Sequence, residues 1–248
     1  MAEWWLLDEP AQRSIAAHLD SAAERVVQHF DDHRDENSLT AALCLEIIRE
    51  PILLNDTTII FNYRNFAEQS EENKVGADGG IRITIKNRDD EVEKGVLFQA
   101  KRFPQNRSTR LLSIPNKKEV SRFKRQISSM LDWTEESILL GHTRNGIYAV
   151  EAVSLEERSV EELRYPFKEA RLVTLGTYLG KWVARCSRGD EDPGLIQRIR
   201  EGRGFITHLL EMDIQTRQRT LLTEGGSPVN LDASTINKIP QPHWRTRR

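Results

Sequence analysis

Three polar residues, Asp78, Gln99 and Lys101, have the types and spacing of a metal-dependent hydrolytic site. Because Gln99 and Lys101 alternate with Ala100, a β-strand would place both of their side chains on one surface. A carboxylate and an amide oxygen a few ångströms apart can hold a hard cation such as Mg²⁺, which keeps several waters for a phosphate substrate. A lysine beside the cation can orient or deprotonate the attacking water. The three residues therefore indicate phosphodiester hydrolysis, provided that the fold brings Asp78 to Gln99.

The surrounding sequence predicts strands that would bring these residues together. Alternating apolar residues occupy 81–85 and 96–98, on either side of charged turn material at 87–93, which is typical of a β-hairpin. Asp78 stands at the entrance of the first strand, within a Gly-Ala-Asp-Gly-Gly turn, and Gln99 lies near the end of the second. The hairpin is therefore expected to build the site.

The arrangement of Asp78, Gln99 and Lys101 resembles the PD-(D/E)xK nuclease superfamily. More narrowly, GADGG followed by VLFQAKR is similar to the Mrr-like restriction endonucleases, in which Gln takes the place of the usual acid. The resemblance covers residues 36–153 and implies a DNA endonuclease of bacterial defence, with Mg²⁺ or Mn²⁺ as its cofactor. It also implies that Asp78, Gln99 and the carbonyl of Ala100 bind the metal, and that Lys101 positions the water.

The superfamily usually carries one more acid on the helix before the sheet, and this chain has two candidates. The segment LTAALCLEIIRE, capped by Asn37 or Ser38, predicts that helix. If the helix begins early, a rotation of about 100° per residue places Glu36 on the buried side and Glu46 on the polar side. We therefore expect Glu36 to be the catalytic acid, with Glu46 as the alternative.

A basic segment begins at the predicted catalytic lysine. Residues 101–125 contain nine Lys or Arg and one acid, whereas the whole chain has a net charge of −2. Cations along a surface release counterions from a nucleic-acid backbone and supply most of its non-specific affinity. Arg102, next to Lys101, could bind the scissile phosphate. The residues expected to contact nucleic acid are Arg102, Arg107, Arg110, Lys117, Lys118, Arg122 and Arg125.

The order of predicted elements indicates an α/β fold. After the helix that follows Glu36 come a strand at 57–63, the central hairpin, a helix at 117–131 and a second hairpin with an Asn-Gly turn at 145–146. This order matches the core expected of the restriction-endonuclease-like fold, which is a mixed sheet flanked by helices. Gln126, on the second helix, is a further candidate for contact with the site or with a phosphate.

The chain is expected to surround this core with helical segments. We predict an N-terminal helical segment at 1–35, the nuclease core at 36–160, a helical subdomain at 161–222 and a flexible basic tail at 223–248. The helical subdomain is predicted because apolar residues recur through 172–214 without any chemical motif. It is compatible with packing on the core, with recognition of a partner and with a homodimer.

Composition excludes several classes of protein. The two cysteines, Cys44 and Cys186, allow neither a disulfide framework nor a zinc knuckle. No apolar run approaches a membrane span, and no basic region precedes the short apolar patch at the start of the chain. We therefore expect a cytoplasmic protein without a membrane partner, whose partners are DNA and other subunits of a defence system.

Overall fold

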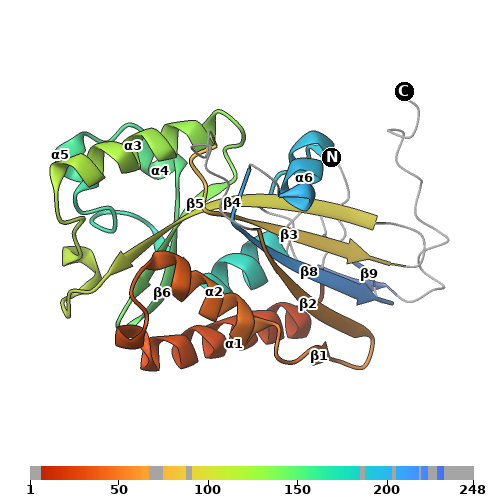
Figure 1. Ribbon diagram of the computed structural model, residues 1–248. Helices are drawn as coiled ribbons and strands as arrows, with labels where there is room; N and C mark the ends of the chain where they lie inside the picture. The colour runs from red at the N-terminus through yellow and green to blue at the C-terminus, as the bar shows by residue number, and fades with distance from the viewer. Residues whose placement is uncertain are drawn as a thin grey trace.

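The computed structural model describes residues 7–66, 75–87, 91–184, 188–202, 205–217, 219–222 and 228–231. Its centre is a mixed eight-stranded sheet with the strand order β1-β2-β8-β3-β4-β5-β6-β7 (Figure 1). The strands are β1 (Ile52–Leu53), β2 (Thr57–Asn65), β3 (Gly79–Lys86), β4 (Glu91–Phe103), β5 (Ser137–Thr143), β6 (Gly146–Glu151), β7 (Leu172–Thr174) and β8 (His208–Thr216), with β9 (Arg219–Leu222) and β10 (Pro228–Leu231) in a separate pair. The predicted α/β class, a mixed sheet flanked by helices, is confirmed.

Helices cover both faces of the sheet, below and above it in Figure 1. The helical elements are α1 (Glu9–Gln28), η1 (Phe30–Asp32), α2 (Glu36–Ile47), η2 (Thr109–Leu111), α3 (Lys117–Leu131), α4 (Val153–Glu156), α5 (Val160–Leu163), the π-helix η3 (Thr177–Val183) and α6 (Pro193–Glu201). A lower apolar cluster joins the sheet to α1, α2 and η3, and an upper cluster joins it to α3, α4, α5 and α6. None of the helices in the described ranges has the length and apolar composition needed to cross a bilayer.

The helix that carries Glu36 begins at that residue. Its N-cap is Asp35, whose side chain accepts a hydrogen bond from the Ser38 backbone N–H, while the Ser38 hydroxyl accepts one from the Asp35 backbone. This reciprocal pairing satisfies two backbone groups at the end of the helix. The hydrogen bond from the Ser38 backbone is the main reason why the pKa of Asp35 lies below its ordinary value. The cap therefore precedes the predicted Asn37 or Ser38, and the early start that favours Glu36 is observed.

The elements from α2 to β6 follow the predicted order, but the helical subdomain predicted at 161–222 is wrong in its C-terminal part. Residues 208–216 form β8, which is antiparallel to β2 and parallel to β3 in the middle of the sheet. Leu209 packs in the upper cluster, while Leu210, Met212 and Ile214 pack in the lower one. Leu210, Met212 and Ile214 alternate with the polar residues Glu211, Asp213 and Gln215, which is the period of a strand, so the prediction of a helix overlooked a signal that the sequence carries.

Of the remaining domain predictions, the two C-terminal helices are observed, whereas the predicted boundaries at 35 and 160 do not separate the apolar core. The two helices expected before β8 exist as η3 and α6. The lower cluster contains residues of α1, η3 and β8, so apolar packing crosses the predicted boundaries at 35 and 160. The predicted flexible tail at 223–248 lies outside the described residues, apart from the strand at 228–231.

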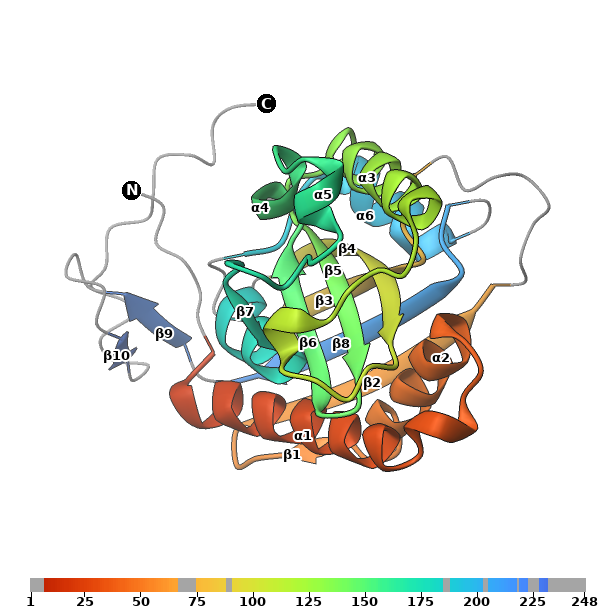
Figure 2. The same ribbon diagram turned by 90° about the vertical axis from the view of Figure 1, so that its left-hand side faces the viewer.

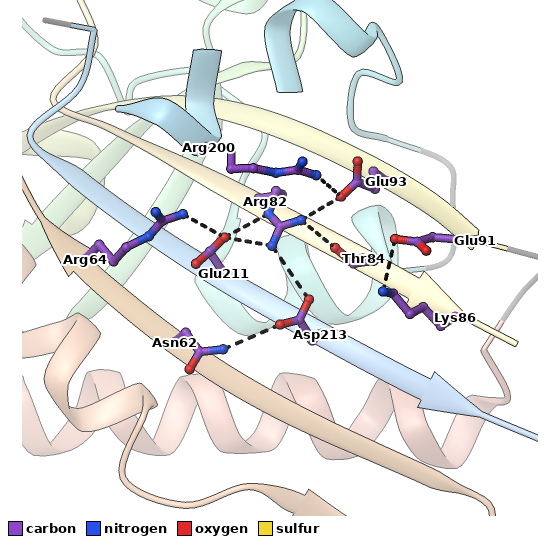
Figure 3. Close-up of polar contacts among 10 residues, drawn as sticks. All are labelled: Asn62, Arg64, Arg82, Thr84, Lys86, Glu91, Glu93, Arg200, Glu211 and Asp213. Carbon is purple, nitrogen blue, oxygen red and sulfur yellow. Dashed lines mark hydrogen bonds and ion pairs between the residues drawn. The ribbon is translucent and has the colours of Figure 1, made fainter. Parts of the chain in front are cut away.

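Beside α6, the upper face of the strands β2, β8, β3 and β4 carries a network of charged side chains (Figure 3). Arg82 is its centre, because its guanidinium contacts Glu211 at 2.7 Å and Glu93 at 2.6 Å. Arg200 of α6 also contacts Glu93, and Arg64 also contacts Glu211. The acids and arginines of this network neutralise one another, so the network ties α6 to the sheet and leaves no unpaired charge at its centre.

Candidate active site at the free edge of β4

The site lies where β4 extends past the end of its neighbour β3. The antiparallel pairing of the two strands ends at Gly79 opposite Phe98, whereas β4 continues to Phe103 in parallel pairing with β5. The edge of β4 from Gln99 onward therefore has backbone groups that β3 does not use. Asp78, the residue before β3, lies beside this edge.

The backbone of Asp78 is fixed by strands on both sides. Its N–H donates to Phe98 O at 2.9 Å, and its carbonyl accepts from the N–H groups of Thr207 and His208 at 2.9 and 3.1 Å. Gly76 has φ +75°, and a Cβ there would overlap the backbone of Gln126 in α3. Only glycine combines this left-handed backbone with so close an approach. The glycine-rich turn thus holds Asp78 in place between the sheet and α3.

Three of the predicted groups converge at this edge. The Asp78 carboxylate accepts a hydrogen bond from the Ala100 N–H at 2.9 Å and another from the Gln99 amide Nε2. The same Nε2 lies 3.1 Å from the Ala100 carbonyl. The NH₂ group of Gln99 therefore links the Asp78 carboxylate to the Ala100 carbonyl, and these are the three groups that the sequence predicts as metal ligands.

Gln99 is more deeply buried than the sequence suggests. Only 1% of Gln99 is exposed, whereas the Lys101 side chain, two positions along the strand, is 19% exposed. The Gln99 Oε1 atom is buried and has no hydrogen-bond partner among the described residues. A buried, unsatisfied amide oxygen costs free energy. The donor set, a carboxylate, a main-chain carbonyl and this unpaired oxygen, fits a hard divalent cation.

Burial raises the pKa of the Asp78 carboxyl from its ordinary value of 3.8 to about 6. The positive charge of Lys101 and the hydrogen bond from the Ala100 N–H lower this pKa, while the negative charge of Glu36 raises it. Arg122 of α3 is also close enough for its charge to lower the pKa. Asp78 is thus a carboxylate in an environment that favours additional positive charge.

Lys101 and Glu36 lie at the rim of the same site. The Lys101 Nζ is 3.4 Å from Glu36 Oε1, and the Glu36 side chain is 38% exposed. The alternative acid, Glu46, instead pairs with Arg25 at 2.6 Å and with Arg49 at 2.9 Å. Of the two candidates, the structure therefore brings Glu36, and not Glu46, to Lys101.

Arg102 does not join the site. Its guanidinium lies 4.5 Å from the centre of the Phe30 ring and donates to Phe30 O at 3.4 Å, on the face of β4 that packs in the lower cluster. Strand alternation explains the difference, since Lys101 and Arg102 must point to opposite faces. The expectation that Arg102 binds the scissile phosphate is therefore corrected, because Arg102 braces η1 against β4.

The other predicted contact residues form an exposed basic strip on the loop after β4 and on α3. We define the strip by six residues: Arg107, Arg110, Lys117, Lys118, Arg122 and Arg125. Among the described residues none of the six has an ion-pair partner, whereas the cations of the Arg82 network and of α1 are paired with acids. Exposed cations that no described acid pairs with are available to a polyanion, and one of them, Arg122, is close enough for its charge to act on Asp78.

Two buried histidines near the site were not predicted as part of it. His142 Nε2 lies 3.1 Å from Thr40 Oγ1, and that hydroxyl donates to Glu36 O at 2.8 Å, so β5 supports the first turn of α2. His208 Nδ1 lies 2.8 Å from the Tyr63 hydroxyl. Burial lowers the pKa of His142 to about 3 and that of His208 to about 4, so both are neutral at pH 7.

Gln126, predicted as a further contact residue, lies on the side of α3 that packs against Gly76. Its Oε1 is buried without a hydrogen-bond partner among the described residues.

Comparisons of the chain with known protein families, with curated proteins and with solved structures returned no match. The function is therefore argued from the geometry of the site.

Proposed function

We propose that this protein is a metal-dependent nuclease that hydrolyses phosphodiester bonds of DNA. The observation that carries the proposal is the convergence of the Asp78 carboxylate, the Gln99 amide and the Ala100 carbonyl at the free edge of β4. Two features support it: the ion pair between Lys101 and Glu36 at the rim, and the basic strip, which has no ion-pair partner in the part of the chain that the structure describes. The sequence resemblance to the Mrr-like endonucleases is in keeping with the same reaction.

Asp78, Gln99 and the Ala100 carbonyl would hold Mg²⁺ or Mn²⁺. Such a cation neutralises charge on the phosphate and lowers the pKa of bound water. The hydrogen bonds to its backbone keep Asp78 in position before any ligand arrives. Gln99 now turns its NH₂ group towards Asp78, so metal binding requires half a turn of the amide. That turn would bring its buried, unpaired oxygen to the position where a ligand is needed.

Lys101 would act on the water and the phosphate. Its ammonium group can donate hydrogen bonds to a phosphate oxygen or to the attacking water, and it stabilises negative charge that develops in the transition state. Glu36 keeps the ammonium at the rim of the site at 3.4 Å. Arg122, whose positive charge lowers the pKa of Asp78, would help to neutralise the same phosphate.

We also propose that the DNA is foreign DNA and that the enzyme serves bacterial defence, as the resemblance implies. The basic strip can bind backbone phosphates, which position a protein on DNA but carry no sequence information. Selection of the target would then depend on a further element: another subunit of a defence system, or a second copy of this chain.

A second candidate is a DNA-binding subunit of such a system without catalytic activity. The observation that favours it is that Gln99, which contacts Asp78 beside the Ala100 carbonyl, is a neutral amide and not a second carboxylate. With one negative charge fewer than an acid would provide, metal affinity should be weaker. In this candidate the basic strip would still bind DNA.

The proposal is tested by incubating the full chain with supercoiled plasmid and Mg²⁺ or Mn²⁺, with and without EDTA. We expect metal-dependent nicking that Asp78→Ala and Lys101→Ala abolish and Glu36→Gln reduces, while circular dichroism shows that all three variants are folded. The matched control is Glu46→Gln, because Glu46 lies on the same helix but pairs with Arg25 and Arg49.

The possible outcomes separate the candidates. Nicking that survives both alanine substitutions contradicts the site. Salt-sensitive plasmid binding without nicking by the wild-type protein favours the DNA-binding subunit. A parallel incubation with RNA decides the substrate class, since cleavage of RNA alone would replace DNA as the substrate.

A further inference from the structure

The loop between β4 and α3 presents an exposed leucine among the cations of the basic strip. Leu111, the last residue of η2, is 57% exposed, and its neighbour Arg110 and nearby Arg107 are exposed as well. Residues 104–118 include four basic residues and no acid. A single exposed leucine is ordinary on a protein surface. Leu111 differs in that Arg107 and Arg110, close to it in the sequence, are exposed and have no ion-pair partner among the described residues, so the loop also suits a nucleic-acid backbone.

The loop holds this leucine on a braced support. Leu112 and Ile114, on either side of Ser113, are 1% and 3% exposed and pack in the upper cluster. Gln105 Nε2 donates to Ser113 O at 2.9 Å, and the Ile114 N–H donates to Arg164 O at 2.9 Å. The bonds from Leu111 N–H to Ser108 O and from Leu112 N–H to Thr109 O close the turn. Leu111 therefore projects from a fixed turn.

We propose that Leu111 is a wedge that inserts between two base pairs of duplex DNA while the neighbouring arginines hold the phosphates. In Figure 2 the loop between β4 and α3 crosses the near side of the sheet, between α1 below and α3 above. Apolar wedges of DNA-binding proteins unstack one base step and bend the duplex, and the contacts that the bend adds offset the cost of unstacking. Flexible pyrimidine–purine steps would be the preferred points of insertion. This inference rests on the proposed function, since it takes DNA as the ligand.

The test uses the full chain in EDTA, so that the DNA stays intact, and a duplex that carries 2-aminopurine at its TA steps. Insertion of Leu111 unstacks the fluorescent base, so binding should raise its emission. We expect Leu111→Ala to abolish this rise and to weaken binding about tenfold, equivalent to about 1.4 kcal/mol. We expect Leu111→Phe to preserve the rise. The dependence of binding on salt should stay unchanged in Leu111→Ala, because the phosphate contacts remain.

The matched control is Leu53→Ala, because Leu53 is 71% exposed on the edge strand β1, outside the basic strip. This control should bind and unstack the duplex as the wild type does. Duplex binding with no rise in emission, or with an equal rise in Leu111→Ala, overturns the wedge and leaves the nuclease proposal standing. Failure of the wild-type protein to bind any duplex overturns both.

Discussion

Replacing Asp78 by asparagine is expected to stabilise the metal-free protein at neutral pH while removing its proposed activity. The reason is that burial disfavours the charged carboxylate, which raises the pKa of Asp78 from 3.8 to about 6. A group whose pKa is raised by folding contributes stability below its unfolded pKa and loses that contribution as the pH rises through its folded pKa. Asparagine keeps the shape of aspartate and has no charge to bury.

The size of the effect follows from these two pKa values. Their difference corresponds to about 3 kcal/mol at about 1.4 kcal/mol per pH unit. Solvent reaches part of the Asp78 side chain, so the observed gain should be smaller, about 1–3 kcal/mol. The hydrogen bond from the Ala100 N–H is retained, because the asparagine Oδ1 can accept it. The gain should develop between about pH 4 and pH 7 and be small at lower pH.

The assay is urea unfolding of wild-type and Asp78→Asn protein in EDTA at several pH values. The control is Asp132→Asn, which changes an exposed aspartate after α3 and should leave the midpoint nearly unchanged. Adding Mg²⁺ should stabilise the wild type and not Asp78→Asn, since the variant lacks the carboxylate ligand. A variant that is less stable than the wild type throughout, or a difference that does not vary with pH, would refute the reasoning.

Two further predictions concern the strip and the buried histidines. Arg122→Gln should weaken binding to all DNA sequences alike and reduce the slope of log K against log salt concentration by about one, measured by fluorescence anisotropy; a slope equal to that of the wild type would remove Arg122 from the interface. His142 and His208 have lowered pKa values of about 3 and about 4, so the stability that they contribute is present above pH 6.5 and lost as the pH falls towards these values. The free energy of unfolding in urea should therefore depend less on pH between 6.5 and 4 for His142→Asn than for the wild type. An unchanged pH dependence would show that His142 is not buried in its neutral form.

Much of the fold was predictable because its strands are joined by local signals. The hairpin of β3 and β4 and the hairpin of β5 and β6 each combine apolar alternation with a polar turn, and both are observed. The strand β8 was missed because it pairs with residues more than a hundred positions earlier in the chain. The sequence does carry one local signal, since Leu210, Met212 and Ile214 alternate with Glu211, Asp213 and Gln215, but no neighbouring turn joins this strand to its partners.

The site was predictable to the extent that alternation along one strand determines it. The same two-residue period that places Gln99 and Lys101 on one face places Arg102 on the other, so the position of Arg102 was predictable as well. The feature of the site that no local sequence pattern predicts is the residue at which β3 begins to pair with β4. Because this pairing begins opposite Phe98, the backbone of Ala100 is free to bind the Asp78 carboxylate.

The neutral glutamine also has a structural reason in this arrangement. Gln99 is 1% exposed and directly contacts Asp78, so an acid at position 99 would bury two carboxylates together. Like charges in such a place raise one pKa strongly, and the pair would hold a proton until a metal displaced it. The amide instead donates a hydrogen bond to Asp78, so the site can form before any cation binds. The consequence for the proposed metal site is an Asp78 carboxylate that is held in place beforehand and a Gln99 amide that must turn to bind, so intrinsic metal affinity should be weak and the cation should bind most tightly once the phosphates of DNA complete the coordination.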